Sequence, residues 1–302
     1  MRVVFDASNS PAGMVAEEVF QEMENVTAFF INREIDGNFP AHGPNPLDKE
    51  ATKGLREKVL AEKADFGVVF DGDGDRSIFV DEKGDPFPPY ATATLLFREE
   101  KSPYVASEIL YNDLINTGLF NKEELKPARI GHLFMKEEMR GLDAGAGGEH
   151  SGHFYFKDFF GMDSGVLASV KLLNAFSKTE KTASEFKNSL PKIFSEVKNL
   201  KISLPPEEEI EKKIIAEFGD MAKIEKRDGI TLNVGEARLL SPLPARQCQS
   251  TASAGGRSNG GQAWINIRHS RTEELVRIEG SGKTQNSINE LIGKIEKIIL
   301  GY

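Results

Sequence analysis

The chain has 302 residues, of which 39% are hydrophobic and 28% charged, and its formal net charge is −9. These proportions are typical of a globular protein with two or three domains, and no apolar run reaches the roughly 18 residues of a membrane-spanning helix. The acidic balance argues against nucleic acid or an anionic membrane as a partner. The single cysteine, Cys248, excludes an internal disulfide and a cysteine-based zinc site, so we expect a cytoplasmic protein.

The N-terminal part of the chain alternates strand and helix patterns. Arg2–Asp6 is a short apolar run, residues 12–24 have helical spacing, and residues 36–47 form a loop rich in Gly, Pro and Asn. A second helical pattern over 48–63 leads to the continuous apolar run Phe66–Phe70. This order predicts an α/β domain, in which ligands bind beyond the carboxyl ends of the strands.

A second part of the chain, from about residue 85 to 198, also contains helical patterns. They cover His132–Arg140 and Gly165–Phe176, and Asp163 or Ser164 can cap the start of the latter helix.

The last part, residues 199–302, has a different order of elements. A helix over 207–221 precedes three strand patterns and a final helix, which predicts an α+β domain with an antiparallel sheet and helices on one face. Residues 235–262 are rich in Ser, Gly and Ala and lack periodicity, which indicates a disordered insertion.

Three aspartates, Asp71, Asp73 and Asp75, alternate with glycines directly after the apolar run Phe66–Phe70. In extended chain this spacing points the carboxylates to one side, and such oxygen ligands select Mg²⁺ or Ca²⁺. Arg76 can bind a phosphate bridged to the metal. The alternative is a solvated acidic turn, but adjacent carboxylates repel each other without a cation. An EF-hand loop fits poorly, because its sixth position requires Gly and is Arg76 here.

A glycine-flanked turn offers Glu149, Ser151 and His153 at alternate positions, where they can bind sugar hydroxyls. The alternative is a surface hairpin. His132 stands near the start of a helix, where a lone histidine is more often a cap or a surface residue than a catalyst.

A further segment carries Arg268, Ser270 and Thr272 at alternate positions, with Arg277 beyond it. Guanidinium and hydroxyl donors in this arrangement can clamp a phosphate. A solvated polar edge of a sheet is the alternative.

Taken in order, these segments resemble the α-D-phosphohexomutase family, which includes phosphomannomutases and phosphoglucomutases. The segments that carry the resemblance are Val4–Asn9, Asp36–Pro40, Pro44–Pro46, Asp71–Arg76 and Gly148–Asp158. The resemblance implies three of the family's four domains. Two are α/β domains at 1–84 and 85–198, each with a mixed sheet between helices, and the third is an α+β phosphate-binding domain at 199–302 with an antiparallel sheet.

The resemblance also implies an activity. A phosphohexomutase transfers a phosphoryl group between the 1- and 6-positions of a hexose phosphate through a phosphoserine and a bisphosphate intermediate. By position, the Mg²⁺ ligands are Asp71, Asp73 and Asp75, and the catalytic residues are Arg76, His132 and Lys101. The implied substrate ligands are Glu149, Ser151, His153, Arg268, Ser270, Thr272 and Arg277.

The sequence departs from the family pattern at several points. It contains no segment like Ser-His-Asn-Pro, so we expect the phosphoserine domain to be missing, or supplied by a separate chain. We expect no helix between Gly84 and Leu95. Arg98 and Glu99 do not match the catalytic-lysine segment of the family, to which Lys101 is assigned. The alternative function is therefore a non-catalytic remnant that binds Mg²⁺ and a sugar phosphate.

Overall fold

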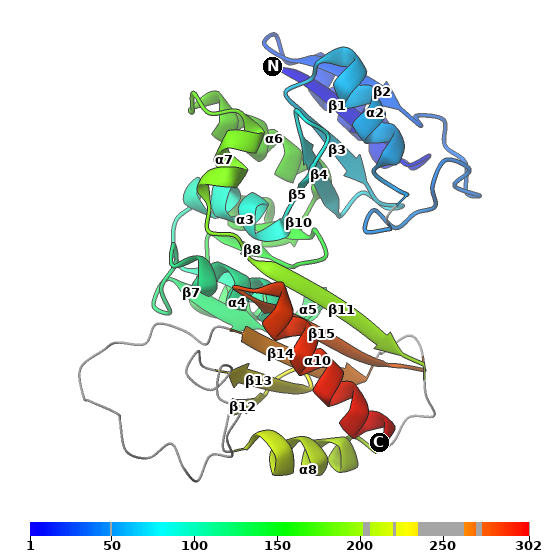
Figure 1. Ribbon diagram of the computed structural model, residues 1–302. Coiled ribbons are helices and arrows are strands. Elements are labelled where there is room, and N and C mark those ends of the chain that lie inside the picture. Colours follow the sequence, from blue (N-terminus) through cyan, green and yellow to red (C-terminus); the bar gives the residue numbers. More distant parts are fainter. Residues whose placement is uncertain (49, 202–205, 220–221, 235–262, 270–273, 302) are drawn as a thin grey trace. The chain divides into compact units, whose positions relative to one another are not determined.

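The structure is a computed structural model that describes residues 1–302 except 49, 202–205, 220–221, 235–262, 270–273 and 302. The chain divides into two compact units (Figure 1), the first comprising Met1–Leu110, Glu123–Pro127 and Gly131–Pro191, the second Tyr111–Lys122, Ala128–Ile130 and Lys192–Tyr302. Among the helices of the described residues, none combines the length and the apolar character needed to cross a membrane.

The first sheet is a mixed sheet between helices. Its elements and the helices that cover it are β1 (Arg2–Asp6), α1 (Ala12–Gln21), β2 (Thr27–Ile31), α2 (Lys53–Glu62), β3 (Phe66–Phe70), β4 (Ser77–Asp81) and β5 (Pro86–Phe87). The strand order is β2-β1-β3-β4-β5, parallel from β2 to β3 and antiparallel from β3 to β5. Successive side chains of a strand face opposite ways. Phe5 stacks on Phe20 of α1 at 4.2 Å, while Val4 packs with Leu55 and Val59 of α2, so the helices cover opposite faces.

The second sheet is also mixed. Its region comprises α3 (Pro89–Arg98), β6 (Tyr104–Ser107), α4 (Glu108–Thr117), β7 (Leu125–Ala128), α5 (His132–Leu142), β8 (Ala146–Gly148), β9 (Phe154–Phe156), η1 (Lys157–Phe159), β10 (Met162–Asp163), α6 (Gly165–Ser177) and α7 (Ala183–Ser189). The strand order is β10-β9-β8-β6-β7, with β6 and β8 parallel and β8, β9 and β10 antiparallel. A Cβ at Gly147 would lie 2.7 Å from Sδ of Met139, so the small residues of β8 allow α5 to pack closely.

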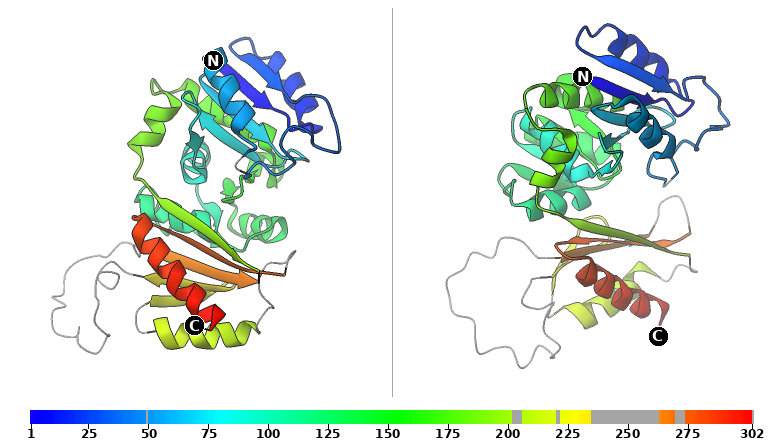
Figure 2. Two further views of the ribbon diagram at one scale, coloured as in Figure 1. Left: turned by 45° about the vertical axis from the view of Figure 1, so that its right-hand side comes forward. Right: turned by 45° about the horizontal axis from the view of Figure 1, so that its top comes forward.

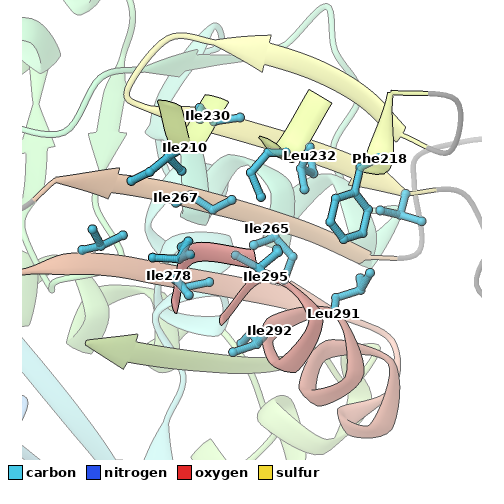
Figure 3. Close-up of a cluster of buried hydrophobic side chains, with 14 of the residues drawn as sticks. Ile210, Phe218, Ile230, Leu232, Ile265, Ile267, Ile278, Leu291, Ile292 and Ile295 are labelled. Atoms are coloured by element: carbon cyan, nitrogen blue, oxygen red, sulfur yellow. The ribbon is translucent and has the colours of Figure 1, made fainter. Parts of the chain in front are cut away.

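The third sheet, in the second unit, is antiparallel throughout. Its elements are β11 (Phe194–Leu200), α8 (Glu207–Phe218), β12 (Ala222–Lys226), β13 (Ile230–Val234), β14 (Ala263–His269), β15 (Val276–Gly282) and α10 (Gln285–Leu300). The strand order is β11-β15-β14-β13-β12, and α10 runs across this sheet (Figure 2). Ile210 of α8 and Ile295 of α10 share one buried cluster with Ile265, Ile267 and Ile278 (Figure 3), so both helices cover the same face.

The structure differs from the sequence-based expectations at several points. The predicted absence of a helix between Gly84 and Leu95 is wrong, because α3 begins at Pro89. Proline suits a first helical position, since its missing N–H would have no partner there and its φ is already helical. β5 belongs to the first sheet although it lies beyond residue 84, and β11 begins at Phe194, before the predicted boundary at 198. The insertion predicted at 235–262 lies outside the described residues.

Candidate active site

The acidic loop, Asp71–Arg76, joins β3 to β4 and is organised by Asp71. The carboxylate of Asp71 is buried, and its Oδ1 accepts hydrogen bonds from the backbone N–H groups of Gly74 at 2.8 Å and Arg76 at 3.1 Å. Its Oδ2 accepts from Nε of Arg76 at 2.6 Å. Gly74 has φ +80°, and a Cβ there would lie 2.7 Å from Cβ of Ala12, so both backbone conformation and space require glycine.

Two carboxylates of this loop, those of Asp71 and Asp75, have pKa values that are shifted in opposite directions. Burial raises the pKa of Asp71 to about 6, against the opposing effect of Arg76. Burial alone would raise the pKa of Asp75 as well, but the close contact and charge of His153 outweigh it and lower the pKa to about 2. Asp73 is exposed. One oxygen from each of the three aspartates lies within 4.8 Å of the others, a donor set that suits a hard cation.

The second turn, residues 149–153, follows the carboxyl end of β8. It is closed by backbone bonds from Glu149 N–H to His153 C=O at 2.9 Å and from Gly152 N–H to Glu149 C=O at 3.1 Å. The buried Glu149 carboxylate accepts a hydrogen bond from the Tyr155 hydroxyl at 2.7 Å. Burial raises the pKa of Tyr155, so the hydroxyl remains protonated and donates. Ser151 Oγ lies 2.8 Å from Nδ1 of His153.

The two turns come from different sheets and meet in the first unit. Arg76 and His153 form an antiparallel bridge, and the N–H of Ser77 donates to the carbonyl of Gly152 at 3.1 Å. Nε2 of His153 then lies 3.4 Å from Oδ1 of Asp75. The structure therefore brings the predicted metal ligands next to the predicted sugar ligands.

His132, the first residue of α5, lies at the same place. Its Nε2 is 3.8 Å from Oδ2 of Asp75 and its Nδ1 is 3.1 Å from Oδ2 of Asp163, while its ring is 5.0 Å from that of His153. Nζ of Lys136, one helical turn further along α5, is 3.8 Å from Oδ1 of Asp163.

Asp163 and Lys136 were missed as site residues in the sequence. The sequence pattern makes Asp163 and Ser164 alternative helix caps, and the structure gives that role to Ser164, whose Oγ accepts from the N–H of Leu167 at 3.2 Å. The available signal for Lys136 was its position four residues after His132, which places both on one face of a helix.

Lys101, predicted as catalytic, is separated from this cluster. Lys101 is exposed and precedes β6. Its carbonyl oxygen lies 2.1 Å from where a Cβ of Gly145 would be, so Lys101 is a neighbour of Gly145, the residue directly before β8. Since β6 and β8 are parallel, Lys101 lies at the amino edge of the sheet and the 149–153 turn at the carboxyl edge. The structure thus does not support Lys101 as a member of this site.

The predicted phosphate ligands lie in the second unit. Arg268 of β14 and Arg277 of β15 are register partners, so their side chains leave the same face of the sheet. One guanidinium nitrogen of Arg268 is 3.3 Å from the buried Glu279, and Nε of Arg277 donates to Asn199 at 2.9 Å. Ser270 and Thr272 lie outside the described residues. A phosphate-binding role for this segment stays a prediction.

Comparison with known proteins assigns the chain to a family. A model described as phosphoglucomutase/phosphomannomutase, alpha/beta/alpha domain II, matches residues 1–84, and the corresponding model for domain III matches residues 90–194. Together they cover more than half of the chain. The chain therefore belongs to the phosphoglucomutase/phosphomannomutase family, which confirms the resemblance seen in its motifs.

Individual relatives agree with this assignment. The chain is 27% identical to a phosphomannomutase of Methanocaldococcus jannaschii, over 99% of the chain and 61% of that protein. It is 32% identical to a phosphomannomutase/phosphoglucomutase of Pseudomonas aeruginosa, over 63% of the chain and 42% of that protein.

A solved structure shows the same fold. The crystal structure of a phosphoglucomutase/phosphomannomutase family protein from Burkholderia thailandensis covers 100% of the chain and 60% of its own length, with a TM-score of 0.78 and 22% identity. This likeness confirms the predicted fold class, two α/β domains with mixed sheets followed by an α+β domain. The chain thus spans about three fifths or less of the length of the relatives it matches.

Proposed function

We propose that this chain performs the phosphoryl transfer of a phosphohexomutase, between the 1- and 6-positions of a hexose phosphate. The observation that carries the proposal is the contact between Asp75 and His153, because it joins an acidic loop suited to a cation to a turn suited to sugar hydroxyls. The names of the relatives, phosphomannomutase and phosphoglucomutase, support the same reaction class.

In this proposal the acidic loop holds Mg²⁺ through Asp71, Asp73 and Asp75, whose oxygens already lie within 4.8 Å of one another. A bound Mg²⁺ would supply positive charge to the oxygens of the phosphoryl group in transfer. Arg76 is fixed by Nε to Asp71, and its Nη1 is 3.4 Å from the side-chain oxygen of Asn45. This arrangement orients the outer edge of the guanidinium for a phosphate oxygen.

In this proposal His153 and His132 contact the sugar. Nδ1 of His153 lies next to Ser151 and Nε2 next to Asp75, and the contact with Asp75 outweighs the effect of burial and raises the pKa of His153, which favours a protonated imidazole beside the sugar. His132 is half exposed beside Asp163 and suits proton transfer at the reacting hydroxyl. Glu149 has one oxygen on Tyr155 and a second for a sugar hydroxyl.

Further parts of the proposal concern the rest of the protein. Arg268, Ser270, Thr272 and Arg277 would bind the phosphate that does not react. A phosphoserine-bearing partner chain and a cytoplasmic location also belong to the proposal.

A coupled mutase assay tests this function. Glucose 1-phosphate and mannose 1-phosphate would each be supplied with Mg²⁺ and the hexose bisphosphate, for the chain alone and with a phosphoserine domain added in trans. We expect turnover in at least one of the two arms. Asp73→Asn should abolish this turnover, whereas Glu180→Gln, an exposed substitution outside the site, should leave it unchanged. No turnover in either arm, with Mg²⁺ and hexose phosphate still raising the melting temperature, would replace the mutase by the sugar-phosphate-binding remnant.

A further inference from the structure

A second group of potential metal ligands lies beside the acidic loop and includes both histidines. Asp75, His132, His153 and Asp163 each offer one ligand atom, and these four atoms lie within 4.8 Å of one another. The group shares only Asp75 with the acidic loop. We propose that these four residues, here called the histidine cluster, bind a divalent metal ion of the zinc class, that is Zn²⁺, Co²⁺ or Ni²⁺.

Two oxygens in the cluster have no hydrogen-bond partner in the described residues. They are Oδ1 of Asp75 and Oδ2 of Asp163, both buried. The Asp163 side chain is only 5% exposed. A buried carboxylate oxygen is costly unless a hydrogen bond or a cation compensates it. Each of these oxygens lies close to an imidazole nitrogen, at 3.1 Å for Asp163 and 3.4 Å for Asp75, without the angles of a hydrogen bond, so both are directed into the cluster.

Two distances within the cluster are close to those of a tetrahedral site. Zinc bonds to imidazole nitrogen and carboxylate oxygen measure about 2.0–2.2 Å, so two ligand atoms of a tetrahedron lie about 3.3–3.5 Å apart. Nδ1 of His132 is 3.1 Å from Oδ2 of Asp163, and Nε2 of His153 is 3.4 Å from Oδ1 of Asp75. The second separation is that of a tetrahedral edge and the first is slightly shorter. One ligand atom of each residue lies within 4.8 Å of the others, so the remaining separations have to contract when a metal binds.

The groups that contact the ligating side chains are also placed as they are in metal sites. The second nitrogen of His153, Nδ1, is 2.8 Å from Oγ of Ser151, which fixes the ring and leaves Nε2 for a metal. Nζ of Lys136 is 3.8 Å from Oδ1 of Asp163, the oxygen that is not directed into the cluster. Two imidazoles with two carboxylates suit Zn²⁺, Co²⁺ or Ni²⁺, whereas Mg²⁺ prefers oxygen ligands alone.

Shared use of Asp75 couples the two sites. An ion in the histidine cluster would hold Asp75 together with both histidines of the proposed active site. Zinc-class ions would therefore inhibit the proposed reaction and weaken Mg²⁺ binding by the acidic loop.

Cobalt is the probe for the test, because Co²⁺ with four tetrahedral nitrogen and oxygen ligands absorbs strongly in the visible range. The metal-stripped full chain would be titrated with Co²⁺, and Zn²⁺ would then be added in competition. We expect one Co²⁺ per chain with an intense visible band that Zn²⁺ removes. Asp163→Asn and His132→Gln should each weaken Co²⁺ binding at least tenfold. His132 is 48% exposed, so its variant carries the test if Asp163→Asn fails to fold.

Asp73→Asn is the matched control, since Asp73 belongs to the acidic loop alone. It should weaken Mg²⁺ binding and leave the cobalt band unchanged. The proposal is overturned if no saturable band appears, or if Asp73→Asn removes the band and Asp163→Asn and His132→Gln retain it. The titration involves no substrate and no turnover, so its outcome is independent of the mutase assay.

Discussion

Nε2 of His153 lies 3.4 Å from Oδ1 of Asp75, and this contact joins two turns that belong to different sheets. The backbone bridge between Arg76 and His153 holds the two side chains in register. Because Asp75 is one of the three loop carboxylates and His153 ends the 149–153 turn, each turn depends on the other for its position. The candidate site is therefore a property of the whole first unit.

A double-mutant cycle measures this dependence. In buffer without Mg²⁺, Asp75→Asn and His153→Gln should each lower the free energy of unfolding by about 1–2 kcal/mol, because each leaves a partly buried partner without its counter-charge. The pair should show a coupling energy of about 1 kcal/mol in urea unfolding. Asp73→Asn is the control partner for His153→Gln, since Asp73 is exposed, and these two changes should add. An equal coupling in both cycles would contradict the importance of the contact.

The start of α6 supports the acidic loop through a close approach at Gly165. Its N–H donates to the carbonyl of Gly74 at 3.0 Å, and a Cβ there would lie 2.5 Å from the carbonyl oxygen of Arg76. Gly165→Ala should therefore displace the loop, lower the free energy of unfolding by about 2 kcal/mol and reduce the Mg²⁺-induced rise in melting temperature.

Gly141→Ala in α5 is the control for this substitution. No atom of the described residues lies within 4 Å of where a Cβ at Gly141 would be, so alanine should stabilise the helix by up to about 1 kcal/mol. If Gly165→Ala were as stable as the parent chain and kept its response to Mg²⁺, the loop would not depend on α6.

Local patterns predicted the elements that lie next to the site. The apolar run Phe66–Phe70 is β3 with the same bounds, and the helix predicted at His132–Arg140 is α5 at His132–Leu142. Both signals are contained in one short segment, a continuous apolar run in the first case and helical spacing in the second. The acidic loop was recognisable for the same reason, because its three carboxylates are adjacent in sequence.

Contacts between distant segments could not be predicted in this way. Asp163 becomes a site residue only because β10 and α5 place it 3.1 Å from His132, and no pattern within Met162–Gly165 carries that information. Strands of two or three residues, such as β8, are too short to show a period of two. The hydrogen bond from Tyr155 to Glu149 depends likewise on the pairing of β8 with β9.

Asp113 of α4 should give the protein a pH-dependent stability. It is buried in the second unit, where the Ser281 hydroxyl donates to its carboxylate, and Nε1 of Trp264 donates to Oγ of Ser281 at 2.5 Å. Burial raises the pKa of Asp113 to about 7, against roughly 3.9 in an unfolded chain. Between these values the folded state binds more protons than the unfolded state. The contribution of Asp113 to stability is therefore greatest below about pH 4 and is lost as the pH rises to 7.

Asp113→Asn tests this contribution, because the amide oxygen still accepts from Ser281 while the titration disappears. Near pH 4 the variant and the parent chain should be about equally stable in urea unfolding. At pH 8 the variant should be more stable, by up to about 4 kcal/mol for a shift of three pKa units. A difference that does not change with pH would contradict the raised pKa.

Glu82, in the turn between β4 and β5, should control how often α7 opens. Its carboxylate accepts from the N–H of Ser184 at 3.0 Å and from Oγ1 of Thr182 at 3.1 Å, and the Ser184 hydroxyl donates to it as well. Glu82→Gln keeps the size but replaces charge-assisted bonds by neutral ones at a single acceptor oxygen, at a cost of about 1–2 kcal/mol. Amide hydrogen exchange in α7 should then be about tenfold faster, with α5 unchanged. Glu180→Gln, an exposed change just before α7, should leave the exchange as it is; equal acceleration in both variants would show that net charge, and not the Glu82 contact, holds α7 in place.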